Sequence, residues 1–177
     1  MTIKDDRVEF DYEGKSHQQQ FRTVTDEQVR EVLIALENMS GYELFDITLP
    51  DKSRKKITAQ DLNQYISDVM GEDFSAKDFR TWAGTVLMAV ALDKLGPAEN
   101  EKLSKSNIVE AVKNVAERLG NTPAVCRSNY IHPQVILQYE SGRTLDYFRR
   151  QFKRYRGKYL SLDEKATMKL LTVLIKH

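Results

Sequence analysis

The chain has 177 residues, of which 41% are hydrophobic and 30% charged, as is ordinary for a globular protein with a substantial core. Its net charge of +1, from 27 basic and 26 acidic residues, argues mildly against a nucleic-acid binder. The single cysteine, Cys126, excludes an intrachain disulfide, and no apolar run approaches the roughly 18 residues of a membrane span. We therefore expect a soluble, cytoplasmic protein.

Residues 1–24 are predicted to form a β-hairpin. Residues 7–13 alternate polar and apolar side chains, Gly14-Lys15-Ser16 is typical of a turn, and residues 17–24 can return antiparallel. Lys15 would lie at the hairpin tip. A lysine on a turn is usually a solvated surface group, but it can also act as a general acid.

Four helices are predicted between residues 25 and 119. Three begin at sequences typical of capping boxes, with starts at Thr25, Thr58 and Ser75. Between the first two lies an apolar stretch, residues 44–49, followed by a basic run at residues 52–56. The fourth helix is expected from Ser106 to Leu119, where Gly120 ends it.

Residues 121–133 are predicted to form a rigid turn that carries Tyr130 between two prolines in polar, basic company. A phenol is a poor nucleophile at neutral pH unless its surroundings lower the cost of its anion. Cationic or polar side chains that stabilise the Tyr130 anion would have to come from other parts of the chain. Arg80, at the start of the third helix, could hold a phosphate with two parallel hydrogen bonds or be a surface arginine. Asn121 could cap a helix or donate to a phosphate oxygen.

The C-terminal part contains one or two helical turns at residues 134–139, a basic aromatic segment and a final helix that Ser161 begins. Residues 143–159 hold seven basic side chains against one acid, Asp146. They could bind nucleic-acid phosphates. Alternatively, the aromatic side chains at helical spacing face the core while the charges lie in water. Both interpretations can hold together.

The predicted fold is mainly α (α+β), a helical bundle with a small N-terminal hairpin in a single domain. We divide it into the hairpin at residues 1–24, a helical core at residues 25–140 and a C-terminal segment at residues 141–177. The histidines His17, His132 and His177 and the one cysteine show no metal-ligand spacing, so no metal site is predicted.

Two motifs carry a resemblance to a known family. They run from Lys77 through Asp-Phe-Arg80-Thr-Trp-Ala-Gly-Thr, and from Gly120 through Asn-Thr-Pro-Ala-Val-Cys-Arg-Ser-Asn-Tyr130-Ile-His-Pro. Together they resemble the catalytic region of the bacterial, poxvirus-like type IB DNA topoisomerases, which shares its fold with tyrosine recombinases. The hairpin sequence Phe10-Asp-Tyr-Glu-Gly-Lys15-Ser is similar to the family's lysine-bearing hairpin.

The resemblance implies a role for each matching residue. Tyr130 would attack a DNA phosphodiester and form a 3′-phosphotyrosyl bond, and Lys15 would protonate the leaving 5′ oxygen. Arg80 and Asn121 would stabilise the phosphoryl oxygens, and Lys77 and Arg127 would contact the double-stranded DNA partner. The family needs neither metal nor ATP, and the chain shows no P-loop. A monomer associated with the bacterial nucleoid is expected.

The chain departs from the family pattern in two respects. Many relatives have histidine where this chain has Asn121, which can donate a hydrogen bond but cannot carry charge. The family also has a further catalytic arginine and a DNA-clamping domain before the hairpin, and the chain starts too late to contain either. We therefore expect the C-terminal part of a topoisomerase, which alone relaxes supercoiled DNA feebly or not at all. Vigorous plasmid relaxation would contradict this.

Two alternatives remain open. A tyrosine recombinase would share the fold and the nucleophile, but recombinases usually carry histidine at the position of Lys77. The second alternative is a non-catalytic DNA-binding module on the same scaffold.

Overall fold

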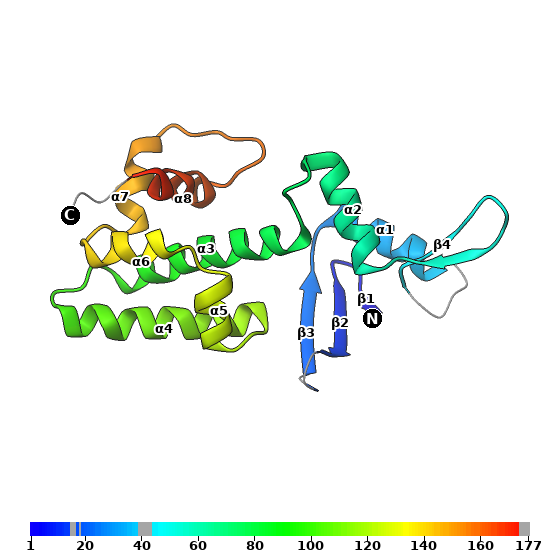
Figure 1. The fold of residues 1–177 in the computed structure, drawn as a ribbon, viewed down its shortest axis with the longest axis horizontal. Coiled ribbons are helices and arrows are strands. Elements are labelled where there is room, and N and C mark those ends of the chain that lie inside the picture. The colour runs from blue at the N-terminus through cyan, green and yellow to red at the C-terminus, as the bar shows by residue number, and fades with distance from the viewer. Residues whose placement is uncertain (15–16, 18, 39–43, 174–177) are drawn as a thin grey trace. The chain divides into compact units, whose positions relative to one another are not determined.

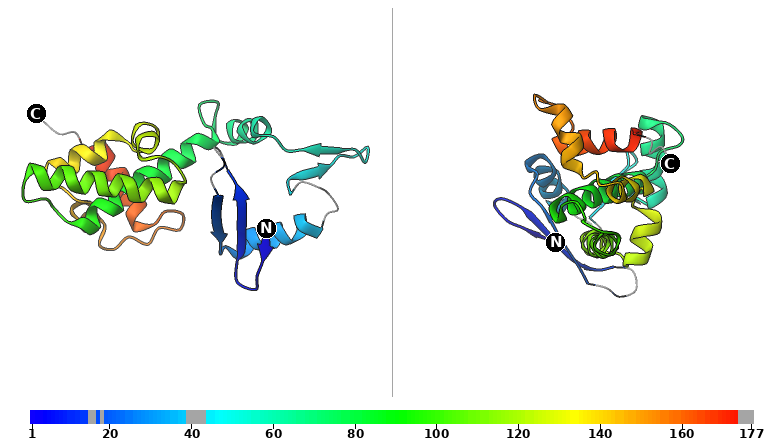
Figure 2. Two further views of the ribbon diagram at one scale, coloured as in Figure 1. Left: turned by 90° about the horizontal axis from the view of Figure 1, so that it is seen from below. Right: turned by 90° about the vertical axis from the view of Figure 1, so that its left-hand side faces the viewer.

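The computed structural model describes residues 1–14, 17, 19–38 and 44–173 (Figure 1). The chain forms two compact units, residues 1–69 and residues 70–177. Helices predominate in both views of the fold, and the strands lie in the N-terminal part (Figures 1 and 2). The predicted mainly helical fold with an N-terminal hairpin is confirmed.

The first unit opens with an antiparallel sheet of three strands in the order β1 (Thr2–Ile3), β2 (Val8–Glu13) and β3 (Gln19–Val24). The β2–β3 pairing is the predicted hairpin, with Val8 opposite Val24 and Glu13 opposite Gln19. Val8 is fully buried. Lys15, predicted at the hairpin tip, lies outside the described residues.

The rest of this unit comprises α1 (Glu27–Asn38), a small hairpin of β4 (Asp46–Thr48) and β5 (Arg54–Lys56), and α2 (Ala59–Met70). The second hairpin was not predicted, because β5 consists only of cations and shows no apolar alternation. Helix α2 begins at the predicted capping box. The Asp61 carboxylate accepts from the Thr58 backbone N–H at 2.9 Å, and the Thr58 hydroxyl accepts from the Asp61 N–H at 3.2 Å.

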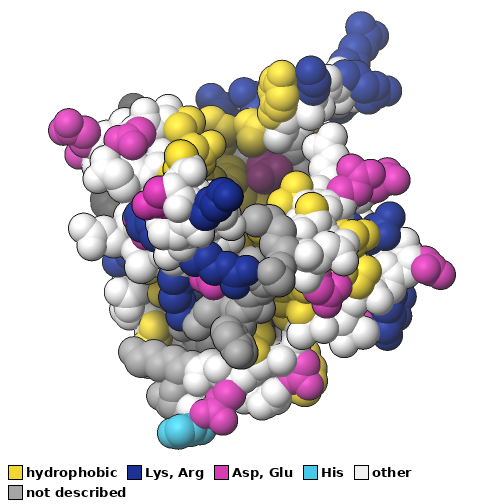
Figure 3. Space-filling model, turned by 90° about the vertical axis from the view of Figure 1, so that its right-hand side faces the viewer, with side chains coloured by type: hydrophobic (Ala, Val, Ile, Leu, Met, Phe, Trp, Pro, Cys, Tyr) yellow, Lys and Arg dark blue, Asp and Glu magenta, His cyan; other side chains and the backbone are white. Residues whose placement is uncertain are grey.

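Several large apolar side chains of the first unit are open to solvent. On α2 only Ile66 is buried, whereas Tyr65 and Val69 are each 66% exposed. Phe21 of β3 is equally exposed. Figure 3 shows hydrophobic side chains, in yellow, lying at the surface among charged ones. Helical spacing thus places the apolar residues of α2 on one side without burying most of them.

The second unit contains the main core and consists of helices, which are α3 (Ala76–Leu95), α4 (Glu101–Leu119), α5 (Pro123–Asn129), α6 (Pro133–Glu140), α7 (Leu145–Arg149), the short 3-10 helix η2 (Arg150–Phe152) and α8 (Leu162–Thr172). In Figures 1 and 2, α3 lies between α4 and α5 on one side and α7 and α8 on the other. Met88, Ala111, Phe148 and Ala166 are fully buried where these helices meet.

Polar caps fix where these helices begin. Ser75 and Asp78 form the predicted capping box of α3, with the Ser75 N–H donating to Asp78 at 2.9 Å. Ser161 and Glu164 do the same for α8. Helix α4 starts five residues before the predicted Ser106, because the Asn100 side chain accepts from the Leu103 N–H at 2.9 Å.

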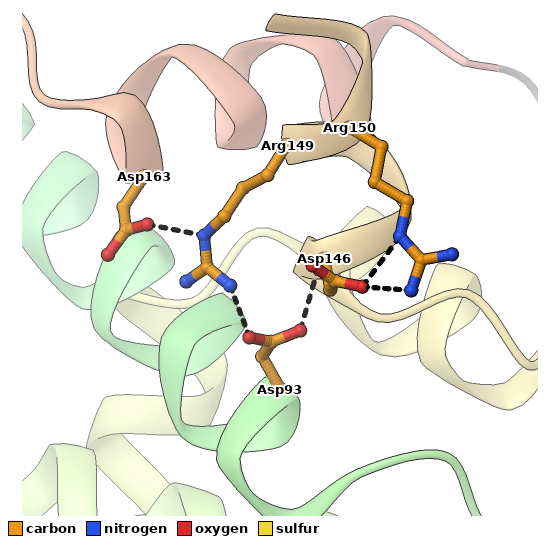
Figure 4. Close-up of polar contacts among 5 residues, drawn as sticks. All are labelled: Asp93, Asp146, Arg149, Arg150 and Asp163. Atoms are coloured by element: carbon orange, nitrogen blue, oxygen red, sulfur yellow. Dashed lines mark hydrogen bonds and ion pairs between the residues drawn. The ribbon is translucent and has the colours of Figure 1, made fainter. Parts of the chain in front are cut away.

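An ionic network joins α3, α7 and α8. Figure 4 shows Arg149 reaching between Asp93 of α3 and Asp163 of α8, with a 2.6 Å bond from its Nε to Asp163 and an ion pair to Asp93. Asp93 also accepts from the Asp146 backbone N–H at 2.7 Å. Burial opposes the charge of Arg149, but the bonds to Asp163 and Asp93 hold its pKa above the ordinary value.

We expect Arg149→Met to destabilise the second unit, because it removes the cation that neutralises Asp93, whose side chain is only 14% exposed. The expected loss is about 2 to 3 kcal/mol of unfolding free energy, measured by urea denaturation. Arg150→Met is the matched control, since Arg150 pairs with Asp146 at the surface and should cost less than about 0.5 kcal/mol. Equal losses in the two variants would contradict a structural role for the Arg149 network.

Candidate active site around Tyr130

Tyr130 lies at the C-terminal end of a short helix. The segment predicted as a rigid turn is helix α5, so that prediction is wrong in form. The Thr122 hydroxyl accepts from the Val125 N–H at 3.3 Å, and Pro123 occupies the first turn, where its missing N–H costs nothing. The Tyr130 N–H donates to the Cys126 carbonyl at 2.9 Å and closes the last turn. The half-buried tyrosine is therefore held by regular backbone bonds.

Asn121 is oriented by the end of α4. Gly120 adopts a left-handed conformation with φ 64°, which glycine reaches without strain. The Gly120 N–H bonds to the Glu117 carbonyl at 3.1 Å, and the Asn121 N–H bonds to the Ala116 carbonyl at 2.9 Å. This is a Schellman motif, and it fixes the direction in which Asn121 leaves the helix.

Arg80, Asn121 and Tyr130 converge in the structure. The Arg80 Nη2 donates to the Leu119 carbonyl oxygen at 2.8 Å, and the Asn121 Nδ2 donates to the same oxygen at 3.1 Å. The Arg80 guanidinium carbon lies 5.2 Å from the centre of the Tyr130 ring, within the range of a cation–π contact. The Tyr130 hydroxyl has no hydrogen-bond partner among the residues that the structure describes. Two side-chain donors thus share one carbonyl oxygen, and one of them, Arg80, lies against the Tyr130 ring.

Helix α3 also holds the backbone of Tyr130. Thr85 is 2% exposed, and its hydroxyl donates to the Tyr130 carbonyl at 3.4 Å and accepts from the His132 N–H at 3.1 Å. A Cβ on Gly84 would lie 2.4 Å from the Tyr130 carbonyl oxygen, so only glycine permits this approach. Sequence reasoning assigned no role to either residue. The available signal was a glycine inside an otherwise helical pattern.

Cys126 is not a rival nucleophile. Its side chain is fully buried, and burial raises the pKa of the thiol above its ordinary value, although the charge of Arg80 opposes this. The thiol therefore stays neutral at physiological pH. His132 caps α6, with its Nδ1 accepting from the Gln134 N–H at 3.1 Å.

The other predicted site residues are less constrained. Lys77 and Arg127 are both exposed, in α3 and α5 respectively, and their DNA contacts stay a prediction. Arg7, which directly precedes β2, bonds to Glu9 at 2.7 Å and to Asp6 at 2.9 Å, so two carboxylates already pair with its charge. The role of Lys15 stays a prediction.

The described residues offer neither a membrane span nor a metal site. None of the helices in this part of the chain is long and apolar enough to cross a membrane. No three His, Cys, Asp or Glu side chains within residues 1–14, 17, 19–38 and 44–173 gather closely enough to bind a metal ion. The expectation of metal-free, ATP-free chemistry stays a prediction.

Comparison with known proteins gives the family. Residues 1–158 match the family model of the eukaryotic DNA topoisomerase I catalytic core. The chain belongs to that family. It is also 26% identical over 166 residues to the DNA topoisomerase 1B of Acanthamoeba polyphaga mimivirus, an alignment that covers 84% of this chain and 49% of the viral protein. The resemblance to type IB topoisomerases is therefore confirmed at the level of the family.

The chain spans about half the length of the curated relative that it matches. The family match includes Arg80 and Asn121, which share the Leu119 carbonyl, and Tyr130, whose ring lies against Arg80.

Proposed function

We propose that this chain is the catalytic region of a type IB DNA topoisomerase, which cleaves one strand of double-stranded DNA through Tyr130 and rejoins it. The observation that carries the proposal is the convergence of Arg80 and Asn121 beside Tyr130. The guanidinium has further N–H groups beyond the one bonded to Leu119, and these can bind the oxygens of a phosphodiester. The Leu119 carbonyl keeps both side chains oriented before DNA binds.

The cleavage step balances without a cofactor. The Tyr130 oxygen forms a bond to phosphorus while the bond from phosphorus to the 5′ oxygen breaks. The phenol proton passes to water, and the leaving 5′ oxygen takes a proton from Lys15. Arg80 and Asn121 stabilise the negative charge that develops on the other phosphoryl oxygens. After the cut strand has swivelled, the 5′ hydroxyl attacks the phosphorus of the phosphotyrosine and gives its proton to Lys15. The bond from phosphorus to the Tyr130 oxygen breaks, and that oxygen takes a proton from water.

Finer parts of the proposal rest on the motifs. Lys77 and Arg127 are proposed to contact DNA phosphates, which fits their exposure. We further propose that the chain corresponds to the C-terminal part of a bacterial enzyme, acts as a monomer on nucleoid DNA in the cytoplasm, and needs neither metal nor ATP. The bacterial assignment is supported by the amino-acid sequences of the two motifs that begin at Lys77 and Gly120.

A suicide DNA substrate tests this proposal. A duplex whose downstream strand dissociates after cleavage should leave a slowly accumulating covalent adduct with the chain on a denaturing gel. Tyr130→Phe should lower its yield by at least about a thousandfold, because no other residue would supply the attacking oxygen. Tyr147→Phe, which alters an exposed tyrosine of α7, is the matched control and should keep the adduct. Duplex binding without any adduct would favour the non-catalytic DNA-binding module instead.

A further inference from the structure

Helix α5 ends at Tyr130, and the backbone that follows needs partners for its polar groups. The Tyr130 N–H donates to the Cys126 carbonyl within the helix. The carbonyls at a helix C-terminus, in contrast, have no partner in their own helix. The His132 N–H lies beyond that end, before α6 begins. Because an unpaired backbone group that is taken out of water costs free energy, both groups must be paired by another element.

One side chain of α3 pairs with both groups. The buried Thr85 hydroxyl accepts from the His132 N–H at 3.1 Å, an ordinary length, and donates to the Tyr130 carbonyl at a longer 3.4 Å. A hydroxyl has a single proton to donate and lone pairs with which to accept. Both functions of the Thr85 hydroxyl are therefore used on the same short backbone segment, on either side of Ile131.

Thr81, one turn earlier on α3, does not duplicate this role. Its hydroxyl lies 3.1 Å from the Lys77 carbonyl of its own helix and 3.4 Å from the Asn129 carbonyl of α5. Because the hydroxyl has one proton, it cannot donate fully to both carbonyls, and the shorter distance favours Lys77. Thr85 is thus the threonine of α3 whose hydroxyl is committed to the backbone around Tyr130.

Apolar contacts hold the same segment against the core. Ile131 is 6% exposed and Cys126 is fully buried, and both belong to the main core of the second unit. Such packing is not directional, so it fixes how deep the segment lies but not how its peptide groups are turned. Hydrogen bonds are directional. The Thr85 bonds therefore set the backbone torsions next to Tyr130, and with them the direction in which its side chain leaves the backbone.

We infer that Thr85 is a positioning residue for DNA cleavage, and that its hydroxyl holds the backbone of residues 130–132 so that the Tyr130 oxygen reaches the phosphodiester in a reactive orientation. The inference rests on the proposed function. Thr85 is too buried to touch DNA itself, so it acts only through Tyr130. A nucleophile that is oriented before the reaction loses less freedom on reaching the transition state, which raises the rate.

Three variants separate this role from a purely structural one. Thr85→Val keeps the shape of the side chain but leaves the Tyr130 carbonyl and the His132 N–H without their partner. Thr85→Ser keeps the hydroxyl and removes the methyl group. Thr167→Val is the matched control, because Thr167 of α8 is also fully buried and its hydroxyl bonds to none of the residues that the structure describes.

The measurement is the single-turnover rate of adduct formation on the suicide duplex at saturating DNA. Thr85→Val should lower this rate by at least about tenfold, because small displacements of a reacting group are costly. Thr85→Ser should recover most of the rate, and Thr167→Val should keep it. Affinity for the duplex, measured by anisotropy with Tyr130→Phe added to each variant, should be unchanged. A structural role alone would lower the melting temperature and leave the rate of the folded chain as it was.

Three results would overturn the inference. Thr85→Val might cleave at the original rate, in which case the hydroxyl bonds do not orient the nucleophile. Thr85→Ser could be as slow as Thr85→Val, which would assign the effect to the packing of the methyl group. Equal losses in Thr85→Val and Thr167→Val would show that any change in the buried core slows cleavage.

Amide hydrogen exchange keeps this inference separable from the proposed function. Followed by NMR without DNA, exchange of the His132 N–H should be faster in Thr85→Val, because the amide loses its acceptor. If the original chain forms no adduct, the cleavage proposal fails, and unchanged exchange would show that the hydroxyl does not hold the segment either. If the original chain and Thr85→Val form the adduct equally fast, the cleavage proposal stands and the positioning role is lost.

Discussion

Gly84→Ala is expected to slow adduct formation at Tyr130 by at least about a hundredfold while leaving the chain folded. The added Cβ would lie 2.4 Å from the Tyr130 carbonyl oxygen and 3.1 Å from its Cβ, so the nucleophile's backbone must move away from α3. A displacement of about 1 Å at a reacting group costs on the order of a hundredfold in rate. Single-turnover adduct formation on the suicide duplex measures this loss.

Stability should change much less than the rate. Alanine is favoured over glycine inside a helix by about 1 kcal/mol, which offsets part of the overpacking cost of about 1 to 3 kcal/mol. The control Ala91→Gly makes the reverse exchange two turns further along α3, away from Tyr130. It should lose stability and keep the rate. A Gly84→Ala chain that cleaves at the original rate would show that this close approach does not position the nucleophile.

Arg80→Ala is expected to lower the rate of adduct formation by about a hundred- to a thousandfold, the typical loss when one donor to a developing oxyanion is removed. The same change removes the cation that lies over the Tyr130 ring and its bond to Leu119. Arg80→Lys should recover only a small part, because an ammonium cannot form two parallel bonds to a phosphate.

Arg118→Ala is the matched control for Arg80, since it removes an exposed arginine next to Leu119 in the last turn of α4. Its rate at saturating DNA should stay within about threefold of the original, because a charge at this exposed position does not touch the reacting atoms. Arg80→Ala behaving like Arg118→Ala would contradict the role of Arg80 in stabilising the phosphoryl oxygens.

Features set by local sequence were predicted correctly. The β2–β3 hairpin follows from alternation around a turn, and the starts of α3 and α8 follow from Ser75 with Asp78 and Ser161 with Glu164. The capping signals span four residues and the hairpin signal is continuous along the chain, so a single sequence contains both in full.

The start of α5 and the strand β5 could not be predicted, because their local sequences fit more than one structure. Thr122-Pro123 fits a turn as well as a helix start, and the capping bond to Val125 decided for helix α5. The cationic β5 shows no alternation of polar and apolar residues, so only its pairing with β4 in the structure identifies it as a strand. Local signals with two meanings are resolved only by the surrounding structure.

The sequence predicted candidate residues of the site but not their arrangement. The motifs gave Arg80, Asn121 and Tyr130 as candidates, but the Leu119 carbonyl shared by Arg80 and Asn121 and the contact of Arg80 with the Tyr130 ring depend on how α3, α4 and α5 pack. A glycine inside the α3 pattern is a local signal, but the contacts of Gly84 and Thr85 with the Tyr130 backbone follow only from the packing of α3 against α5. Positioning residues are therefore the part of a site that most needs a structure.

Mass spectrometry of the trapped adduct tests most directly whether Tyr130 is the residue that joins to DNA. After proteolysis and nuclease digestion, we expect a phosphate-linked nucleotide on Tyr130, attached through the 3′ end of the cleaved strand. A link to another residue, or through the 5′ end, would contradict it.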